Sequence, residues 1–119
     1  MTKILIAEDD DHTRDALREV LTMEGHEVIA ASDGLQAVDF FRAESPDFVC
    51  LDVMMPGLNG YQATRTLTRD EDTKGIPVIV CTSKGQETDK IWGLRQGAID
   101  YLVKPLNPEE LLQRIAALP

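Results

Sequence analysis

The sequence contains no long apolar run and no secretion signal. No apolar stretch approaches the ~20 residues that a membrane-spanning helix requires. The chain begins MTKILIAEDD, so its first apolar run is short and is followed at once by acidic residues, unlike a secretory leader. We therefore expect a cytoplasmic protein without a membrane segment.

Cysteine is also scarce. The chain has two cysteines, Cys50 and Cys81, which lie in two separate strand-like runs and lack the short spacing of metal ligands. Such positions are typical of buried thiols that pack as small apolar side chains. We predict that both cysteines belong to the core.

Positive charge is the third deficit. Lysine and arginine number 12 against 21 aspartates and glutamates, giving a formal net charge of −9. This balance disfavours direct binding to nucleic acid or to an anionic membrane, and it fits a protein that uses acidic groups locally, for instance on a metal ion. The chain has 119 residues, 43% of them hydrophobic, and no repeat, low-complexity tract or linker. We expect one domain over residues 1–119 with a single core.

Short apolar runs alternate with amphipathic stretches along the chain. The expected strands are residues 3–7, 27–31, 47–52, 76–82 and 99–103, and the expected helices are residues 12–25, 35–44, 59–69, 87–97 and 107–115. Asn59 and Asn107 are expected to cap the third and the last of these helices. Five strands alternating with five helices predict an α/β fold, in which a doubly wound parallel sheet carries helices on both faces.

The helical period also predicts which side chains face the core. We expect the first two helices to bury one apolar face each, formed by Ala16, Leu17, Val20 and Leu21 in the first and by Leu35, Val38 and Phe41 in the second.

A single carboxylate interrupts one of the most apolar runs. In VCLDVMMPGLNGY, residues 49–61, Asp52 lies at the end of the predicted strand. Pro56 and Gly57 follow shortly afterwards and begin the loop. Right-handed crossovers place the carboxyl ends of all parallel strands at one edge of the sheet, where open α/β sheets carry their chemistry. That edge should collect polar residues from four strands, namely Glu8, Asp9, Asp10, Asp52, Thr82, Ser83 and Lys104.

This set of residue types suits phosphoryl chemistry. Clustered carboxylates repel one another and need a compensating cation, and oxygen ligands without histidine or cysteine favour Mg²⁺ or a similar hard ion. Lys104 can bind one phosphate oxygen, and the Thr82 hydroxyl can donate to another. Asp52 beside these groups can attack phosphorus and form an aspartyl phosphate. Each residue alone has a more ordinary interpretation, such as a helix cap or a surface charge, so the prediction depends on the whole set.

The motifs around these residues resemble those of the response-regulator receiver domain of the CheY type. EDD follows the first strand, LDVMMPGLNG surrounds Asp52, CTS follows the fourth strand, and YLVKP closes the fifth. The likeness covers the chain from end to end. It implies the flavodoxin-like strand order 2-1-3-4-5.

The resemblance also implies a role for each residue of the set. Asp52 resembles the phosphoacceptor, Thr82 the hydroxyl that follows the phosphoryl group, and Lys104 the phosphate-binding lysine. Tyr101 resembles the aromatic residue that changes rotamer on activation. The implied Mg²⁺ ligands are Glu8, Asp9, Asp52 and the backbone carbonyl of Met54. Glu8 departs from the commonest pattern, which has aspartate there.

Partners follow from the same resemblance. The phosphodonor should be a histidine kinase or a histidine phosphotransfer protein. The output should be a surface formed by residues 87–97, 99–103 and 107–115 that docks a downstream protein. We expect a monomer that can dimerise on activation, and a switch that catalyses only its own phosphotransfer and slow autodephosphorylation, not an enzyme with an external substrate.

At finer grain, GLNGYQATRTLTRDEDT and ETDKIWGLRQGAIDYLVKP are similar to the single-domain, PilH-like regulators of type IV pilus twitching motility. The first half of the chain is more similar to receivers attached to DNA-binding domains.

Three alternatives stay open at this point. A small phosphohydrolase of the haloacid-dehalogenase type also uses a strand-end aspartate, but it needs a second acid two residues on, where this chain has Met54, and a longer core. A docking module that is never phosphorylated is disfavoured by the complete set of polar residues. The receiver portion of a longer DNA-binding response regulator would have the same sequence features.

Overall fold

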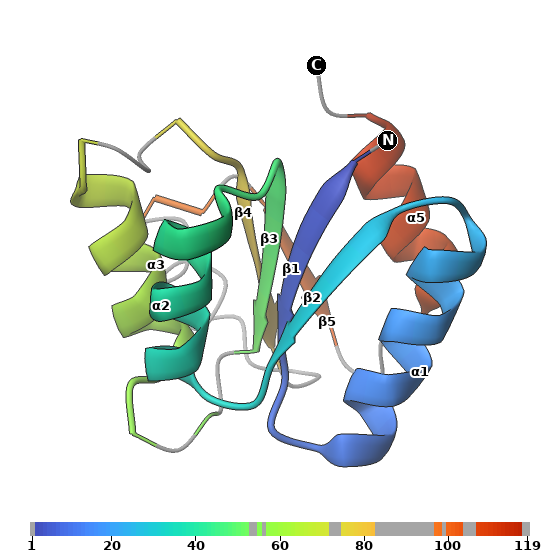
Figure 1. The fold of residues 1–119 in the computed structure, drawn as a ribbon, viewed down its shortest axis with the longest axis horizontal. Helices are drawn as coiled ribbons and strands as arrows, with labels where there is room; N and C mark the ends of the chain where they lie inside the picture. The colour runs from blue at the N-terminus through green and yellow to red at the C-terminus, as the bar shows by residue number, and fades with distance from the viewer. Residues whose placement is uncertain are drawn as a thin grey trace.

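The computed structural model describes residues 2–52, 55, 57–71, 75–82, 97–98, 100–103 and 107–117, with only the backbone of Thr82, Asp100, Val103 and Pro108. Within these residues, one five-stranded parallel sheet lies between two pairs of helices (Figure 1). The elements are β1 (Lys3–Ala7), α1 (Asp11–Met23), β2 (Glu27–Ala31), α2 (Gly34–Glu44), β3 (Phe48–Asp52), α3 (Gly60–Arg69), β4 (Val78–Thr82), β5 (Asp100–Val103) and α5 (Pro108–Ala116).

The strand order is β2-β1-β3-β4-β5, and all four strand pairs are parallel, which confirms the predicted α/β class and order. β1 and β2 have the predicted bounds, β3 begins one residue later and β4 two residues later than predicted, and β5 is described from Asp100 onward. The described part of the chain contains four helices. The fourth predicted helix, residues 87–97, lies outside the described residues except for Gly97.

The two larger buried clusters of the core lie on opposite faces of the sheet. Helices α2 and α3 cover one face, where Phe41 and Leu67 pack with Leu5, Val49 and Leu51. Helices α1 and α5 cover the other face, where the cluster contains Leu17, Leu111, Ile6, Cys50 and Cys81. Successive side chains of a strand point to opposite faces, so Asp52 continues the row of Phe48 and Cys50 and lies on the α1–α5 side of the sheet.

Side-chain caps fix the starts of the helices. Asn59 accepts a hydrogen bond from the Gln62 N–H at 2.9 Å, and the Gln62 side chain accepts one from the Asn59 N–H, which completes a capping box at α3. Asn107 caps α5 by accepting from the Glu109 N–H at 2.9 Å. Both predicted caps are confirmed.

The predicted helix faces are partly wrong. In α1 the buried residues are Leu17 and Leu21, whereas Val20 is half-buried and Ala16 is exposed. In α2 Val38 and Phe41 are buried, but Leu35 is 65% exposed. Each helix turns by about 100° per residue, which carries Ala16 away from the stripe of Leu17 and Leu21 and carries Leu35 away from the buried Gly34.

None of the helices in the described part of the chain has both the length and the apolar character needed to cross a lipid bilayer.

Candidate functional site

Three carboxylates meet at the carboxyl edge of the sheet. Glu8 and Asp9 follow β1, Asp52 ends β3, and one carboxylate oxygen of each lies within 4.8 Å of the other two. Glu8 is 2% exposed and Asp52 is 3% exposed, while Asp9 is open to solvent. The predicted meeting of these three side chains is confirmed.

The strand register produces this arrangement. β1 pairs directly with β3, and Ala7 lies opposite Leu51, so the next residues along the two strands, Glu8 and Asp52, are neighbours. The Glu8 N–H donates to the Ala31 carbonyl at 3.1 Å, which extends the β1–β2 pairing past the end of β1. The acidic pair therefore begins on backbone that is still held by the sheet.

Asp10, the third acid of the EDD motif, is a helix cap. Its carboxylate accepts from the Thr13 N–H at 2.8 Å and from the Thr13 hydroxyl at 2.7 Å. Its own N–H donates to the Glu8 carboxylate at 3.3 Å. Asp10 thus serves the start of α1 and orients the Glu8 side chain.

Arg14 lies beside this acidic turn, and the sequence interpretation did not include it. Its Nη1 donates to the backbone carbonyl of Glu8 at 2.9 Å, and its Nη2 forms an ion pair with Asp11. The Arg14 side chain is 17% exposed. The i,i+3 spacing of Asp11 and Arg14 in the first turn of α1 predicts their ion pair, but no sequence pattern predicts the contact with Glu8.

The three carboxylates fit Mg²⁺. A hard divalent ion prefers oxygen ligands at about 2.0–2.1 Å in an octahedron, so that opposite ligands lie about 4.2 Å apart. The oxygens of Glu8, Asp9 and Asp52, all within 4.8 Å of one another, need only small side-chain adjustments to meet these distances. Because two of the three carboxylates are almost fully buried, a cation also offsets charge that water reaches poorly.

The other predicted site residues are described only in part. Thr82 ends β4 opposite Val103, so its backbone lies at the same sheet edge as Asp52. Tyr101 of β5 lies opposite Val80, is half-buried and packs against Val80 and Ala98. The Thr82 side chain, Met54, Ser83 and Lys104 lie outside the described residues.

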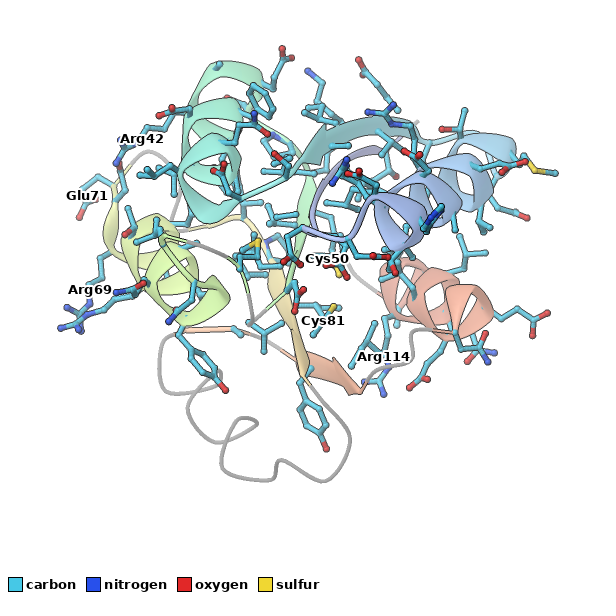
Figure 2. All side chains as sticks on the ribbon, turned by 90° about the horizontal axis from the view of Figure 1, so that it is seen from below. Arg42, Cys50, Arg69, Glu71, Cys81 and Arg114 are labelled. Atoms are coloured by element: carbon cyan, nitrogen blue, oxygen red, sulfur yellow. The ribbon has the colours of Figure 1, made fainter. Side chains whose placement is uncertain are left out.

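Two buried thiols lie beneath the acidic edge. The Sγ atoms of Cys50 and Cys81 are 3.1 Å apart, and both side chains are 2% exposed (Figure 2). The prediction that both are buried thiols is confirmed. Their proximity depends on the register between β3 and β4, which the sequence interpretation did not predict.

Comparison with known proteins identifies the family. Residues 4–116 match the family model of the response regulator receiver domain. The chain is a response regulator receiver domain. This assignment, which agrees with the resemblance of the sequence motifs, makes it a component of two-component signalling.

The alignment with this receiver domain covers nearly the whole length of one curated relative and about half the length of another. Protein PilH of Pseudomonas aeruginosa is 51% identical over 118 residues, which are 99% of this chain and 98% of PilH. The PilH-like resemblance is therefore confirmed. The transcriptional regulatory protein CpxR of Escherichia coli is 46% identical over 118 residues, which are 99% of this chain but 49% of CpxR.

Solved structures give the same fold. The chemotaxis protein CheY4 of Vibrio cholerae superposes with a TM-score of 0.93 at 29% identity, covering 100% of this chain and 99% of that one. A response regulator from Chloroflexus aurantiacus superposes with a TM-score of 0.91 at 36% identity, covering 96% and 93% of the two chains. The CheY-like architecture of the receiver domain is thus shown independently of its motifs.

Proposed function

We propose that this receiver domain is a phosphorylation-controlled switch. Asp52 accepts a phosphoryl group from the phosphohistidine of a kinase or phosphotransfer protein in a Mg²⁺-dependent reaction, and the product changes a protein-docking surface. The observation that carries the proposal is the buried Asp52 carboxylate at the end of β3, within 4.8 Å of the carboxylates of Glu8 and Asp9. Membership of the receiver family supports it.

The chemistry assigned to Asp52 is a displacement at phosphorus. One carboxylate oxygen of Asp52 attacks the phosphorus atom, the P–N bond of the phosphohistidine breaks, and the phosphoryl group is transferred to the aspartate. Glu8, Asp9 and Asp52 would hold Mg²⁺, with the Met54 carbonyl as a further ligand, and the ion would supply positive charge for the phosphoryl oxygens. Lys104 and Thr82 complete the proposed site as donors to the same oxygens. The chain acts on its own aspartate and on no external substrate.

The proposed output begins at Tyr101. This half-buried ring packs against Val80 of β4 and Ala98, and Thr82 lies two residues after Val80 on the same strand. We propose that a change at Thr82 is transmitted to the ring along β4. The target is a downstream protein that docks on residues 87–97, β5 and α5. The net charge of −9 argues against direct contact of this domain with nucleic acid or an anionic membrane. A cytoplasmic location and a monomer that can dimerise on activation are part of the same proposal.

A second candidate is the receiver portion of a longer DNA-binding regulator. The likeness to CpxR favours it, because the chain spans 49% of that protein. PilH, of which the chain spans 98%, is a relative of about the same length as this chain. The length of the reading frame in the native transcript distinguishes the two.

Acetyl phosphate tests the central step. Incubation with acetyl phosphate and Mg²⁺ should add one base-labile phosphoryl group, which peptide mass spectrometry should locate at Asp52. Asp52→Asn should abolish the labelling because an amide is no nucleophile, whereas Asp39→Asn, at an exposed position of α2, should leave it unchanged. Labelling of Asp52→Asn at the wild-type level would overturn the proposal, and an unlabelled but folded wild type would favour a docking module without phosphorylation.

A further inference from the structure

A close contact between the side chains of β3 and β4 on the α1–α5 face joins two sulfurs. The Sγ atoms of Cys50 and Cys81 are 3.1 Å apart, well inside the ordinary contact distance of about 4 Å. A disulfide bond is about 2.05 Å long and usually joins Cα atoms about 4.4–6.8 Å apart. Diagonal neighbours on paired strands lie about 7–8 Å apart, so closing the bond requires the sulfurs to approach by about 1 Å and the two strand backbones to move toward each other. Both side chains belong to the apolar cluster beneath α1 and α5 (Figure 2).

We propose that Cys50 and Cys81 form an oxidisable dithiol, which a small peroxide converts into a disulfide between β3 and β4. The thiolate of one cysteine attacks an oxygen of hydrogen peroxide, an S–O bond forms, the O–O bond breaks, and the released hydroxide takes up the thiol proton as water. The second sulfur then attacks the sulfenic sulfur. The S–S bond forms, the S–O bond breaks, and a second water leaves. Two thiols lose two electrons in total, and one peroxide molecule gains them.

Burial selects the oxidant. Each cysteine is 2% exposed, which excludes direct attack on a bulky disulfide such as oxidised glutathione. Hydrogen peroxide is little larger than water, so burial restricts it less than it restricts larger oxidants. The reaction should therefore be slow and restricted to small oxidants.

The register makes the bond strained and reversible. The Cα partner of Cys50 is Ile79, whereas Cys81 pairs with Asp52, so the two cysteines are offset diagonally by two residues. A disulfide at this offset pulls two hydrogen-bonded strands out of their relaxed positions, and strained disulfides are readily reduced.

The position of the bond connects it to the phosphoacceptor, and this step rests on the proposed function. Asp52 lies opposite Cys81 and two residues after Cys50, on the same face of the sheet. A disulfide that shifts β3 against β4 displaces the Asp52 carboxylate relative to Glu8 and Asp9 on β1. Oxidation should therefore slow phosphorylation of Asp52, and reduction should restore it.

Peroxide treatment of the native chain, followed by non-reducing peptide mass spectrometry, tests the dithiol directly. We expect the loss of two hydrogen atoms per chain, a linked pair of peptides containing Cys50 and Cys81, recovery with dithiothreitol, and no reaction with oxidised glutathione. Cys50→Ala and Cys81→Ala should each prevent the link. The proposal would be overturned if the native thiols stayed reduced while the same peroxide oxidised the urea-unfolded chain, or if sulfinic acids formed without a link.

Acetyl phosphate labelling of the reduced and oxidised chains tests the connection to Asp52. A slower rate in the oxidised chain, restored by reduction, supports it, and equal rates overturn it. A reduced chain that is not labelled at Asp52 would instead overturn the proposed function, while the linked peptides would still establish the dithiol.

Discussion

Glu8 is held at three points, and each contact fixes a different part of the residue. Its N–H donates to Ala31, its carbonyl accepts from Arg14, and its carboxylate accepts from the Asp10 N–H. The extra methylene of glutamate relative to aspartate gives this side chain more freedom, and the last contact limits that freedom. The geometry of the proposed Mg²⁺ site thus depends on residues that do not bind the ion.

Arg14 is the neighbour whose removal should be most informative. In Arg14→Met the partly buried Glu8 carbonyl loses the hydrogen bond from Arg14 Nη1, so we expect Mg²⁺ to bind about 10-fold more weakly, the low end for residues that orient metal ligands. Isothermal titration with Mg²⁺ measures the change. Arg14→Lys should recover part of it.

Arg18→Met is the matched control, because Arg18 is exposed one turn further along α1. It removes the same charge from the same helix without touching Glu8. Equal Mg²⁺ affinities for Arg14→Met and Arg18→Met would show that Arg14 acts only through its charge.

At the scale of elements, the start of α2 and the loop before α3 approach each other closely. A Cβ atom at Gly34 would lie 1.8 Å from the Leu58 carbonyl oxygen. Only glycine permits this approach, and Gly34 is buried at the first position of α2. The contact ties α2 to the segment between β3 and α3.

We expect Gly34→Ala to lower the free energy of unfolding by about 1–3 kcal/mol, because the methyl group must displace backbone. Urea unfolding followed by circular dichroism measures it. Gly75→Ala is the control, since no atom of the described residues lies within 4 Å of a Cβ there. A Gly34→Ala chain as stable as Gly75→Ala would mean that the loop moves aside without cost.

The sequence predicted elements better than contacts between elements. The caps at Asn59 and Asn107 were predicted because a cap depends on residues two or three positions away. The exposure of Leu35 was not predicted, because it depends on which side of α2 faces the sheet. In the site, strand order and direction sufficed to bring Glu8, Asp9 and Asp52 together. The Arg14 and Cys50–Cys81 contacts depend on helix placement and strand register, which no short motif encodes.

At the scale of the whole molecule, a net charge of −9 is combined with two buried carboxylates at one edge of the sheet. Like charges held together by the fold oppose folding, and a cation bound only by the folded chain offsets them. The stability of this domain should therefore depend on divalent ions.

We expect Mg²⁺ at 100 times its dissociation constant to add about 2.7 kcal/mol to the free energy of unfolding. Thermal unfolding with MgCl₂, compared with NaCl at equal ionic strength, measures the specific part. Asp9→Asn removes one proposed ligand and should reduce this response. A response to Mg²⁺ that is equal in wild type and Asp9→Asn would exclude Asp9 as a ligand.

The pairing of β1 with β3 has a consequence for the order of events in folding. Glu8 and Asp52 become neighbours only after α1, β2 and α2 have been looped out between them, and such long-range contacts tend to form slowly. An ion that is bound by both residues can bind only to chains in which β1 and β3 are already paired.

We expect Mg²⁺ to slow unfolding and to leave the folding rate unchanged, which stopped-flow experiments in urea can measure. A folding rate that rises with Mg²⁺ would show that β1 and β3 pair before the transition state. If the folding rate is unchanged, the ion lengthens the lifetime of the folded state and has no effect on how that state forms.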